Sequence, residues 1–122
     1  MIRNLFKKPP KKIGGVWFGV VHYGESRREK QFKCKLSQYG TLIKGVLKTN
    51  EVEKVASYQV RGLMDEGGYL QISIVNEKSD VMNYANGVLQ PDQSYSKFKG
   101  YFIGRSRSIE EVVRGEIEMW KE

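Results

Sequence analysis

Short segments in which apolar and polar residues alternate recur along this chain, separated by clusters of turn-forming residues. Between residues 32 and 36, for example, Phe32, Cys34 and Leu36 alternate with Lys33 and Lys35. Successive side chains of a β-strand point to opposite faces, so a period of two predicts strands with one buried face. The pattern predicts about eight strands. They cover residues 16–23, 30–37, 41–48, 55–64, 69–75, 82–89, 98–104 and 111–120.

Glycine recurs at the inward positions of these strands. The set is Gly19, Gly45, Gly62, Gly87, Gly100, Gly104 and Gly115. A glycine inside a strand costs roughly 0.5–1 kcal/mol relative to alanine, so their number needs a reason. Strands that coil sharply in a small barrel supply it, and short connections favour an up-and-down order. We therefore predict an all-β chain with a closed antiparallel up-and-down β-barrel at 14–122, behind a basic arm at 1–13.

The formal charge of +7 is concentrated at the start of the chain. The cations of residues 1–12 are Arg3, Lys7, Lys8, Lys11 and Lys12, with no acid among them, which leaves +2 for the rest. A nearly neutral body counts against an extended nucleic acid as partner. The arm also carries Ile2, Leu5 and Phe6, a mixture that suits an anionic membrane surface, although a solvated terminus has the same composition.

The cysteine content and the length of the apolar runs indicate the cellular compartment of the protein. Cys34 is the single cysteine, so an internal disulfide is excluded, and no secretory signal is evident. No apolar run approaches the roughly 20 residues that span a bilayer. We expect a cytoplasmic protein, at the inner face of a membrane if the arm binds lipid.

Topology predicts where a ligand would bind. In an up-and-down barrel the first and last hairpin loops lie side by side at one rim, which would bring together Arg27, Arg28, Arg105 and Arg107. Guanidinium groups suit a phosphate-bearing ligand. Just inside that rim, the inward parity predicts Tyr23, Lys30, Phe32, Tyr58 and Asn83, where aromatic faces suit a base. The plain alternative is a set of solvated loop charges paired with nearby glutamates.

An outward apolar face gives a second hypothesis. The outward positions of the first and the last two strands include Phe18, Val20, Tyr101, Ile103, Val112 and Trp120. Exposed apolar patches mark protein contacts, so we predict self-association there.

Signals of catalysis are missing. His22 is the single histidine and is expected on the exterior, and Cys34 alternates with core residues. No set of residues has metal-ligand spacing, so we predict a non-enzymatic chain without cofactor or metal.

Several segments carry a resemblance. They are Gly15-Val16-Trp17, Gly45-Val46-Leu47, Tyr58-Gln59-Val60-Arg61-Gly62 and Phe98-Lys99-Gly100-Tyr101. They resemble the small lipocalin and avidin-type eight-stranded barrels, in which a tryptophan opens the first strand. The basic arm leading into Gly14-Gly15-Val16-Trp17 is also similar to the junction before the cyclic-nucleotide-sensing barrel of two-transmembrane-helix anti-phage (CBASS-type) effectors. That resemblance implies a receptor for a cyclic oligonucleotide in antiviral defence.

Three functional classes therefore stay open. The first is a receptor for an anionic, nucleotide-like small molecule at the arginine rim, with binding coupled to self-assembly. The second is a protein-interaction barrel without a small ligand. The third, a single-stranded nucleic-acid binder, has the body's low net charge against it.

Overall fold

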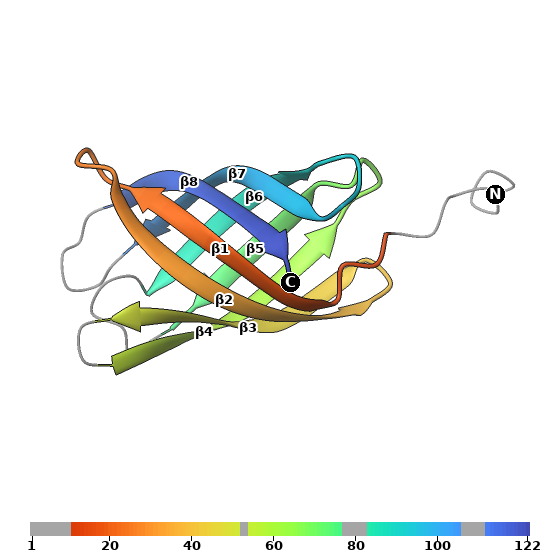
Figure 1. Cartoon of the computed structure of the whole chain (residues 1–122), viewed down its shortest axis with the longest axis horizontal. Coiled ribbons are helices and arrows are strands. Elements are labelled where there is room, and N and C mark those ends of the chain that lie inside the picture. Colours follow the sequence, from red (N-terminus) through yellow and green to blue (C-terminus); the bar gives the residue numbers. More distant parts are fainter. Residues whose placement is uncertain (1–10, 52–53, 77–82, 106–111) are drawn as a thin grey trace, which may run out of the picture.

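The structure is a computed structural model that describes residues 11–51, 54–76, 83–105 and 112–122. Eight antiparallel strands follow one another around a closed barrel in sequence order, and β1 pairs with β8 (Figure 1). The predicted closed up-and-down barrel is confirmed. The strands are β1 Gly15–Tyr23, β2 Arg28–Tyr39, β3 Leu42–Glu51, β4 Lys54–Met64, β5 Leu70–Val75, β6 Tyr84–Pro91, β7 Lys97–Arg105 and β8 Val112–Lys121.

The two ends of the barrel differ in what they carry. We call the end where β1 begins and β8 ends the floor; the connections β2–β3, β4–β5 and β6–β7 lie there too (Figure 1). The opposite end, with the other four connections, we call the mouth. Of the mouth connections, the structure describes the turn from Gly24 to Arg27 and the residues Asn76 and Asn83 that border the β5–β6 connection.

Apolar residues that alternate with polar ones in the sequence are buried in the barrel, and the polar ones between them are exposed. In β2, Phe32, Cys34 and Leu36 are buried between exposed lysines, as expected. Strand limits differ from the prediction by a few residues. The strand β2 is longer at both ends, and β6 begins at Tyr84 rather than at residue 82. Asn83 therefore precedes the strand.

Inward glycines alternate with large side chains around the barrel. One row of paired residues, from β4 through β5, β6, β7 and β8 to β1, reads Gly62, Ile72, Gly87, Phe102, Gly115 and Tyr23. A Cβ atom at Gly115 would collide with the carbonyl oxygen of His22 and with the ring of Phe102. Tight coiling of the strands in a small barrel brings neighbouring backbones this close, so Gly115 is required here for the reason predicted from the sequence.

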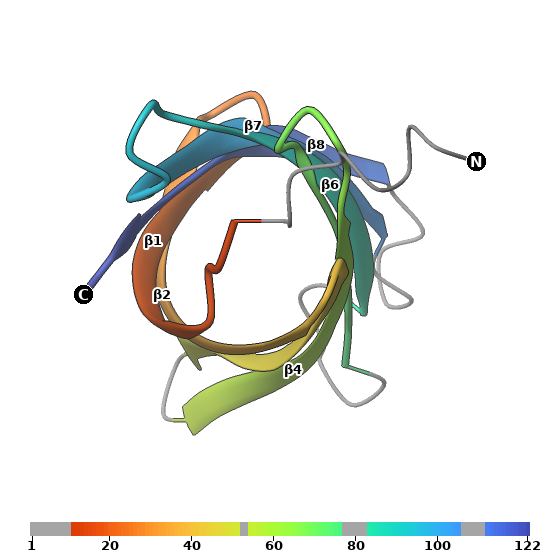
Figure 2. The ribbon, with the colours of Figure 1, turned by 90° about the vertical axis from the view of Figure 1, so that its right-hand side faces the viewer.

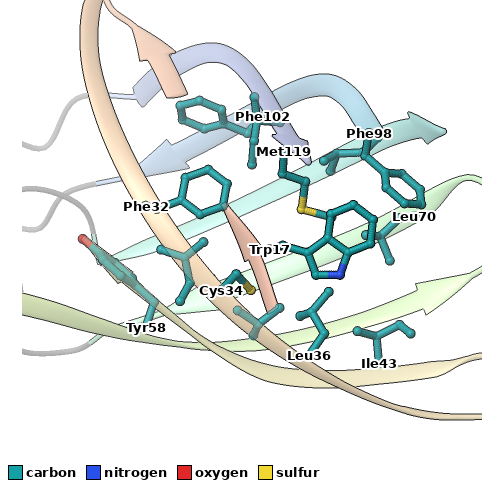
Figure 3. Close-up of a cluster of buried hydrophobic side chains, with 14 of the residues drawn as sticks. Trp17, Phe32, Cys34, Leu36, Ile43, Tyr58, Leu70, Phe98, Phe102 and Met119 are labelled. Carbon is teal, nitrogen blue, oxygen red and sulfur yellow. The ribbon is translucent and has the colours of Figure 1, made fainter. Parts of the chain in front are cut away.

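The floor is filled by large side chains in tight contact. Trp17 and Phe98 are fully buried and meet edge to face, with ring centroids 5.5 Å apart (Figure 3). Ile43, Met64, Leu70 and Leu89 complete this layer, and each is at most 1% exposed. Trp17 thus plugs the barrel floor together with Phe98.

Residues 11–14 cross the floor instead of leading straight away from it (Figure 2). Ile13 is fully buried in the core, and its amide donates to Oε1 of Gln38 at 2.7 Å. The indole Nε1 of Trp17 donates to the Ile13 carbonyl at 2.8 Å, and Gln38 Nε2 donates to the Lys11 carbonyl at 2.9 Å. The last residue assigned to the arm from the sequence is thus part of the hydrophobic core.

Candidate functional site

The interior changes character between floor and mouth. Toward the mouth, the structure contains a small apolar cavity of about 50 Å³. Its walls come from all eight strands, and they include Tyr23, Lys30, Phe32, Thr49, Tyr58, Ile74, Ala85 and Phe102. Four of the predicted interior residues, Tyr23, Lys30, Phe32 and Tyr58, therefore line one space. Because one water molecule takes up about 10–15 Å³ of such a cavity, the space accepts a few heavy atoms of a ligand and not a whole molecule.

Thr49 is the one buried polar side chain in the described residues that lacks a hydrogen-bond partner. It points inward from β3 between Phe32 on β2 and Ala56 on β4, and it is 6% exposed. Burying a hydroxyl without a partner costs roughly 1–3 kcal/mol. The orphaned hydroxyl borders the cavity, so a polar ligand atom that entered would find a partner there. Nothing in the sequence indicates the unpaired hydroxyl, since threonine is an ordinary strand residue.

Positive charge lies at the rim of this cavity. Lys30 is half-buried and lines the cavity wall, and Arg28 precedes it by two residues with the same parity, directly opposite Tyr23 in the register. Tyr23 and Lys30 come from the first hairpin, whose turn holds Arg27 at a φ of 49°. An aromatic ring, an ammonium and a guanidinium thus gather on one side of the mouth.

Asn83 is buried at the mouth, where it forms hydrogen bonds with backbone groups. Its Nδ2 donates to the carbonyl of Asn76 at 3.0 Å, and the two residues are also joined by a backbone hydrogen bond of 2.9 Å. Its own amide donates to the carbonyl of Arg105. Asn83 therefore holds the ends of β5, β6 and β7 together, and it is absent from the cavity wall.

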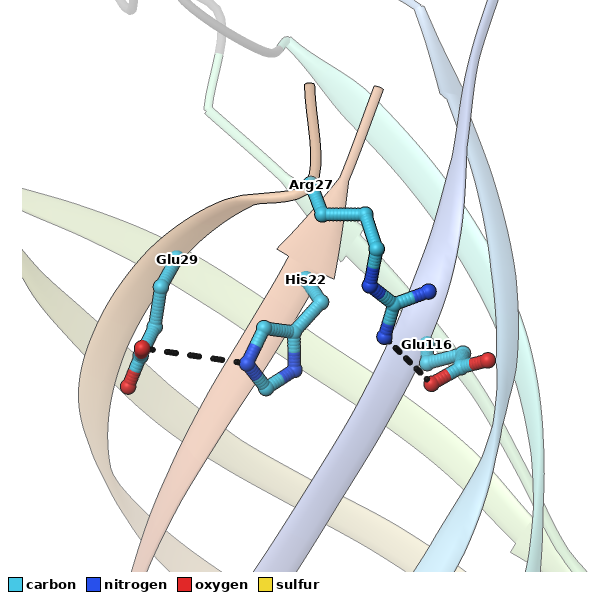
Figure 4. A network of polar contacts seen from close by, with 4 residues as sticks. All are labelled: His22, Arg27, Glu29 and Glu116. Atoms are coloured by element: carbon cyan, nitrogen blue, oxygen red, sulfur yellow. Dashed lines mark hydrogen bonds and ion pairs between the residues drawn. The ribbon is translucent and has the colours of Figure 1, made fainter. Parts of the chain in front are cut away.

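The predicted arginines are not all on the same side of the barrel wall. Arg27 forms an ion pair with Glu116 on β8 at 3.2 Å, and His22 lies 3.8 Å from Glu29 on the outer surface (Figure 4). Arg105 shares the outward parity of Tyr101 and Ile103 on β7. Arg107 lies outside the described residues. Of the three arginines with a described position, Arg28 is the one with inward parity; it is exposed and lies opposite the cavity residue Tyr23 in the register.

The predicted self-association residues lie on the outer surface in two groups. Phe18 pairs directly with Trp120 across β1 and β8, beside Val20. Tyr101 and Ile103 lie on β7, and Val112 is near the mouth on β8. The charged β8 residues Arg114, Glu116 and Glu118 separate the two groups in the register. Tyr101 pairs instead with Val88 on β6, so the apolar neighbour of Tyr101 in the register lies on the side away from β1.

A wide groove of about 1110 Å³ runs over the outer side of β4 to β8. It contains Tyr101, Ile103 and Val88 together with Arg61 and Arg114. The ion pair of Arg27 with Glu116 lies at its border, so Arg27 belongs to this outer groove as well as to the rim.

No geometry for covalent or metal chemistry is evident in the described parts of the chain. Burial raises the pKa of the Cys34 thiol to about 12, so it stays protonated at neutral pH and is a poor nucleophile. Among the residues with a described position, no three His, Cys, Asp or Glu side chains gather as metal ligands.

Comparison with known proteins adds no assignment. No protein-family model matches the sequence, and no curated protein matches it at a significant level. The resemblance to lipocalin-like barrels is supported by the structure alone, and only in that both are closed barrels of eight strands. Within the described residues, no helix has the length and apolar character needed to cross a membrane.

Proposed function

We propose that this chain is a non-enzymatic receptor whose barrel mouth binds a small anionic ligand of nucleotide type. The observation that carries the proposal is the orphaned Thr49 hydroxyl, buried beside an apolar cavity whose rim is cationic. A largely apolar pocket with a few polar groups is the usual form of a small-molecule site. The part of the ligand that enters offers a hydrogen-bonding atom to Thr49.

The chemistry around the cavity favours an aromatic ring joined to a phosphate. Tyr23 and Phe32 offer aromatic faces to a base, while Lys30 and Arg28 suit phosphate oxygens at the rim. Because the cavity holds only a few atoms, the charged part of such a ligand would stay at the mouth among these cations. With only an edge of the ring inward and the phosphate outward, the ligand avoids the large cost of burying a charge.

A more specific proposal concerns the identity of the ligand, the biological process and the location of the protein in the cell. The resemblance of the Gly14-to-Trp17 segment and its basic arm to CBASS-type effectors suggests a cyclic oligonucleotide as the ligand. We then propose a cytoplasmic sensor at the inner face of a membrane, acting in antiviral defence. The support is the resemblance and the lysine-rich composition of residues 1–12.

A thermal-shift screen of the full chain against mononucleotides and cyclic di- and trinucleotides tests the proposal. A ligand at 100 times its dissociation constant stabilises by about 2.7 kcal/mol, which raises Tm by several degrees. Thr49→Val keeps the shape of the side chain and removes the hydroxyl. We expect this variant to be about 1 kcal/mol more stable without ligand and to lose most of the ligand-induced shift.

Matched variants identify the site. Arg28→Gln should reduce the ligand-induced shift, whereas Arg61→Gln, which removes the same charge from the outer wall, should leave it unchanged. A shift that survives Thr49→Val and Arg28→Gln would contradict the proposed site. No shift across the panel would favour the competing function.

The competing proposal is a protein-interaction barrel that uses its outer face. It is favoured by the exposure of Tyr101 at 72%, Ile103 at 45% and Trp120 at 39%. Sedimentation of the full chain would then show concentration-dependent association that Tyr101→Ser or Trp120→Ser abolishes, with no effect of Thr49→Val.

A further inference from the structure

The outer face of β2, β3 and β4 carries cations without acids. We call the outward residues of these strands between Gln31 and Leu63 the β2–β4 face; the three strands lie side by side, with the β2–β3 turn at the floor (Figure 1). Five exposed cations belong to it: Lys33, Lys35, Lys44, Lys48 and Arg61. Within the described residues of these strands, no aspartate or glutamate occupies an outward position between Gln31 and Leu63.

Four of these cations directly oppose each other across strands. Lys33 pairs with Lys48 in the β2–β3 register, and Lys44 pairs with Arg61 in the β3–β4 register. Like charges opposite each other on one sheet face destabilise the pairing. The nearly neutral net charge of the barrel body conceals this concentration, because the acids lie elsewhere. An anionic surface against the face would relieve the repulsion.

An apolar row borders the cations on the floor side. Tyr39, Leu42 and Leu63 are direct neighbours in the register of β2, β3 and β4. Their exposed fractions are 72%, 57% and 41%. Gln38, next to Tyr39, donates to the carbonyls of both Lys11 and Gly40 at 2.9 and 2.8 Å, so the chain at Lys11 passes beside the β2–β3 turn.

We propose that the β2–β4 face docks on an anionic lipid bilayer. Its lysines contact lipid phosphates and carboxylates, while Tyr39, Leu42 and Leu63 enter the interfacial layer near the floor. This order, apolar edge followed by basic side chains, is that of surface-bound amphipathic segments. A single-stranded nucleic acid is disfavoured because the face offers one aromatic ring, Tyr39, at its edge and hence no series of stacking surfaces. The face is separate from the ligand cavity, and this proposal does not depend on it.

Sedimentation of the full chain with vesicles tests the proposal. Vesicles of phosphatidylcholine with phosphatidylserine are compared with phosphatidylcholine alone, at low and at physiological salt. Each lysine near an anionic membrane strengthens binding about fivefold, so Lys33→Gln with Lys48→Gln should weaken it about 25-fold. The control is Lys97→Gln with Lys99→Gln on β7, which removes the same net charge from another side of the barrel.

The apolar row has its own matched control. Tyr39→Ser should weaken vesicle binding severalfold, and Tyr101→Ser, on an equally exposed tyrosine of β7, should not. Thermal melting checks that all four variants fold; the Lys33/Lys48 variant should melt no lower than the parent chain because a repulsive pair is removed.

Three results would overturn the proposal. Equal loss of binding in the Lys33/Lys48 and Lys97/Lys99 variants would assign binding to net charge or to the N-terminal residues. Equal binding to both kinds of vesicle, or to neither, would remove the role of anionic lipid. A fluorescent thymidine oligonucleotide that binds more tightly than the vesicles, and that depends on Lys33 and Lys48, would assign the face to nucleic acid.

Discussion

The floor and the mouth of this barrel use the same strands and the same alternation but pack in opposite ways. At the floor, Trp17, Phe98, Leu70 and Leu89 are fully buried, and the polar Nε1 of Trp17 has a partner. At the mouth, inward side chains leave a cavity, and the hydroxyl of Thr49 has none. Tight packing and satisfied polar groups stabilise a fold, whereas space and unpaired groups offer binding. Under the proposed function, the barrel divides these two tasks between its ends.

The largest expected effect tests the floor. Trp17→Ala should lower the free energy of unfolding by about 3–5 kcal/mol, because the residue is fully enclosed and its removal leaves a large void. Chemical denaturation measures the loss. Trp120→Ala is the control on the outer surface, at 39% exposure, and its loss should be much smaller. Similar losses for both tryptophans would contradict the floor as the stabilising end.

A pair of identical truncations compares the two ends directly. Ile43→Ala at the floor should cost about 3–4 kcal/mol, and Ile74→Ala beside the cavity at most about 2 kcal/mol. The difference arises because Ile74 is half-buried and already borders empty space, so less contact is lost. Equal costs, measured by denaturation of both variants, would show that the mouth is as tightly packed as the floor.

The smallest effect is a pH dependence at the floor. Partial desolvation tends to raise the pKa of Asp92 in the β6–β7 turn, but hydrogen bonds from the Lys97 and Ser96 amides and from the hydroxyls of Ser94 and Ser96 outweigh it, so the pKa is lowered. The resulting stabilisation is complete above the ordinary carboxyl pKa of about 4 and is lost as the pH falls through the lowered value.

Asp92→Asn should therefore reduce stability slightly at neutral pH and flatten its acid dependence. Melting curves recorded between neutral and strongly acidic pH measure this. Asp65→Asn, in the neighbouring β4–β5 turn, provides the comparison. An unchanged acid slope in Asp92→Asn would contradict the lowered pKa.

Period-two patterning made the barrel predictable, because parity alone assigns Phe32, Cys34 and Leu36 to the core. Parity has no meaning outside strands, which is why the burial of Ile13 was not foreseen. The partner of Arg27 was missed for another reason. Glutamates close in sequence were considered, whereas Glu116 is 89 residues away and comes near only through the β1–β8 register.

The candidate site was predictable in part. Tyr23, Lys30, Phe32 and Tyr58 share a cavity because their inward parity and height along the strands follow from strand order. The convergence of the arginines was inferred from loop membership, which does not decide whether a side chain points over the rim or along the outer wall. Nor does sequence indicate that Thr49 lacks a partner, since that depends on every neighbour in the packed interior.

The position of the C-terminal end at the floor has a practical consequence. The amide of Glu122 donates to the carbonyl of Val16, and that of Lys121 to Ser96, so the C-terminal end is fixed beside the entry of β1. A biotin tag, fluorophore or chip linkage after Glu122 therefore holds the molecule at the floor, opposite the mouth. Immobilised in this way, every copy presents the Thr49 cavity to the solution, and the ligand panel can be read without obstruction by the attachment.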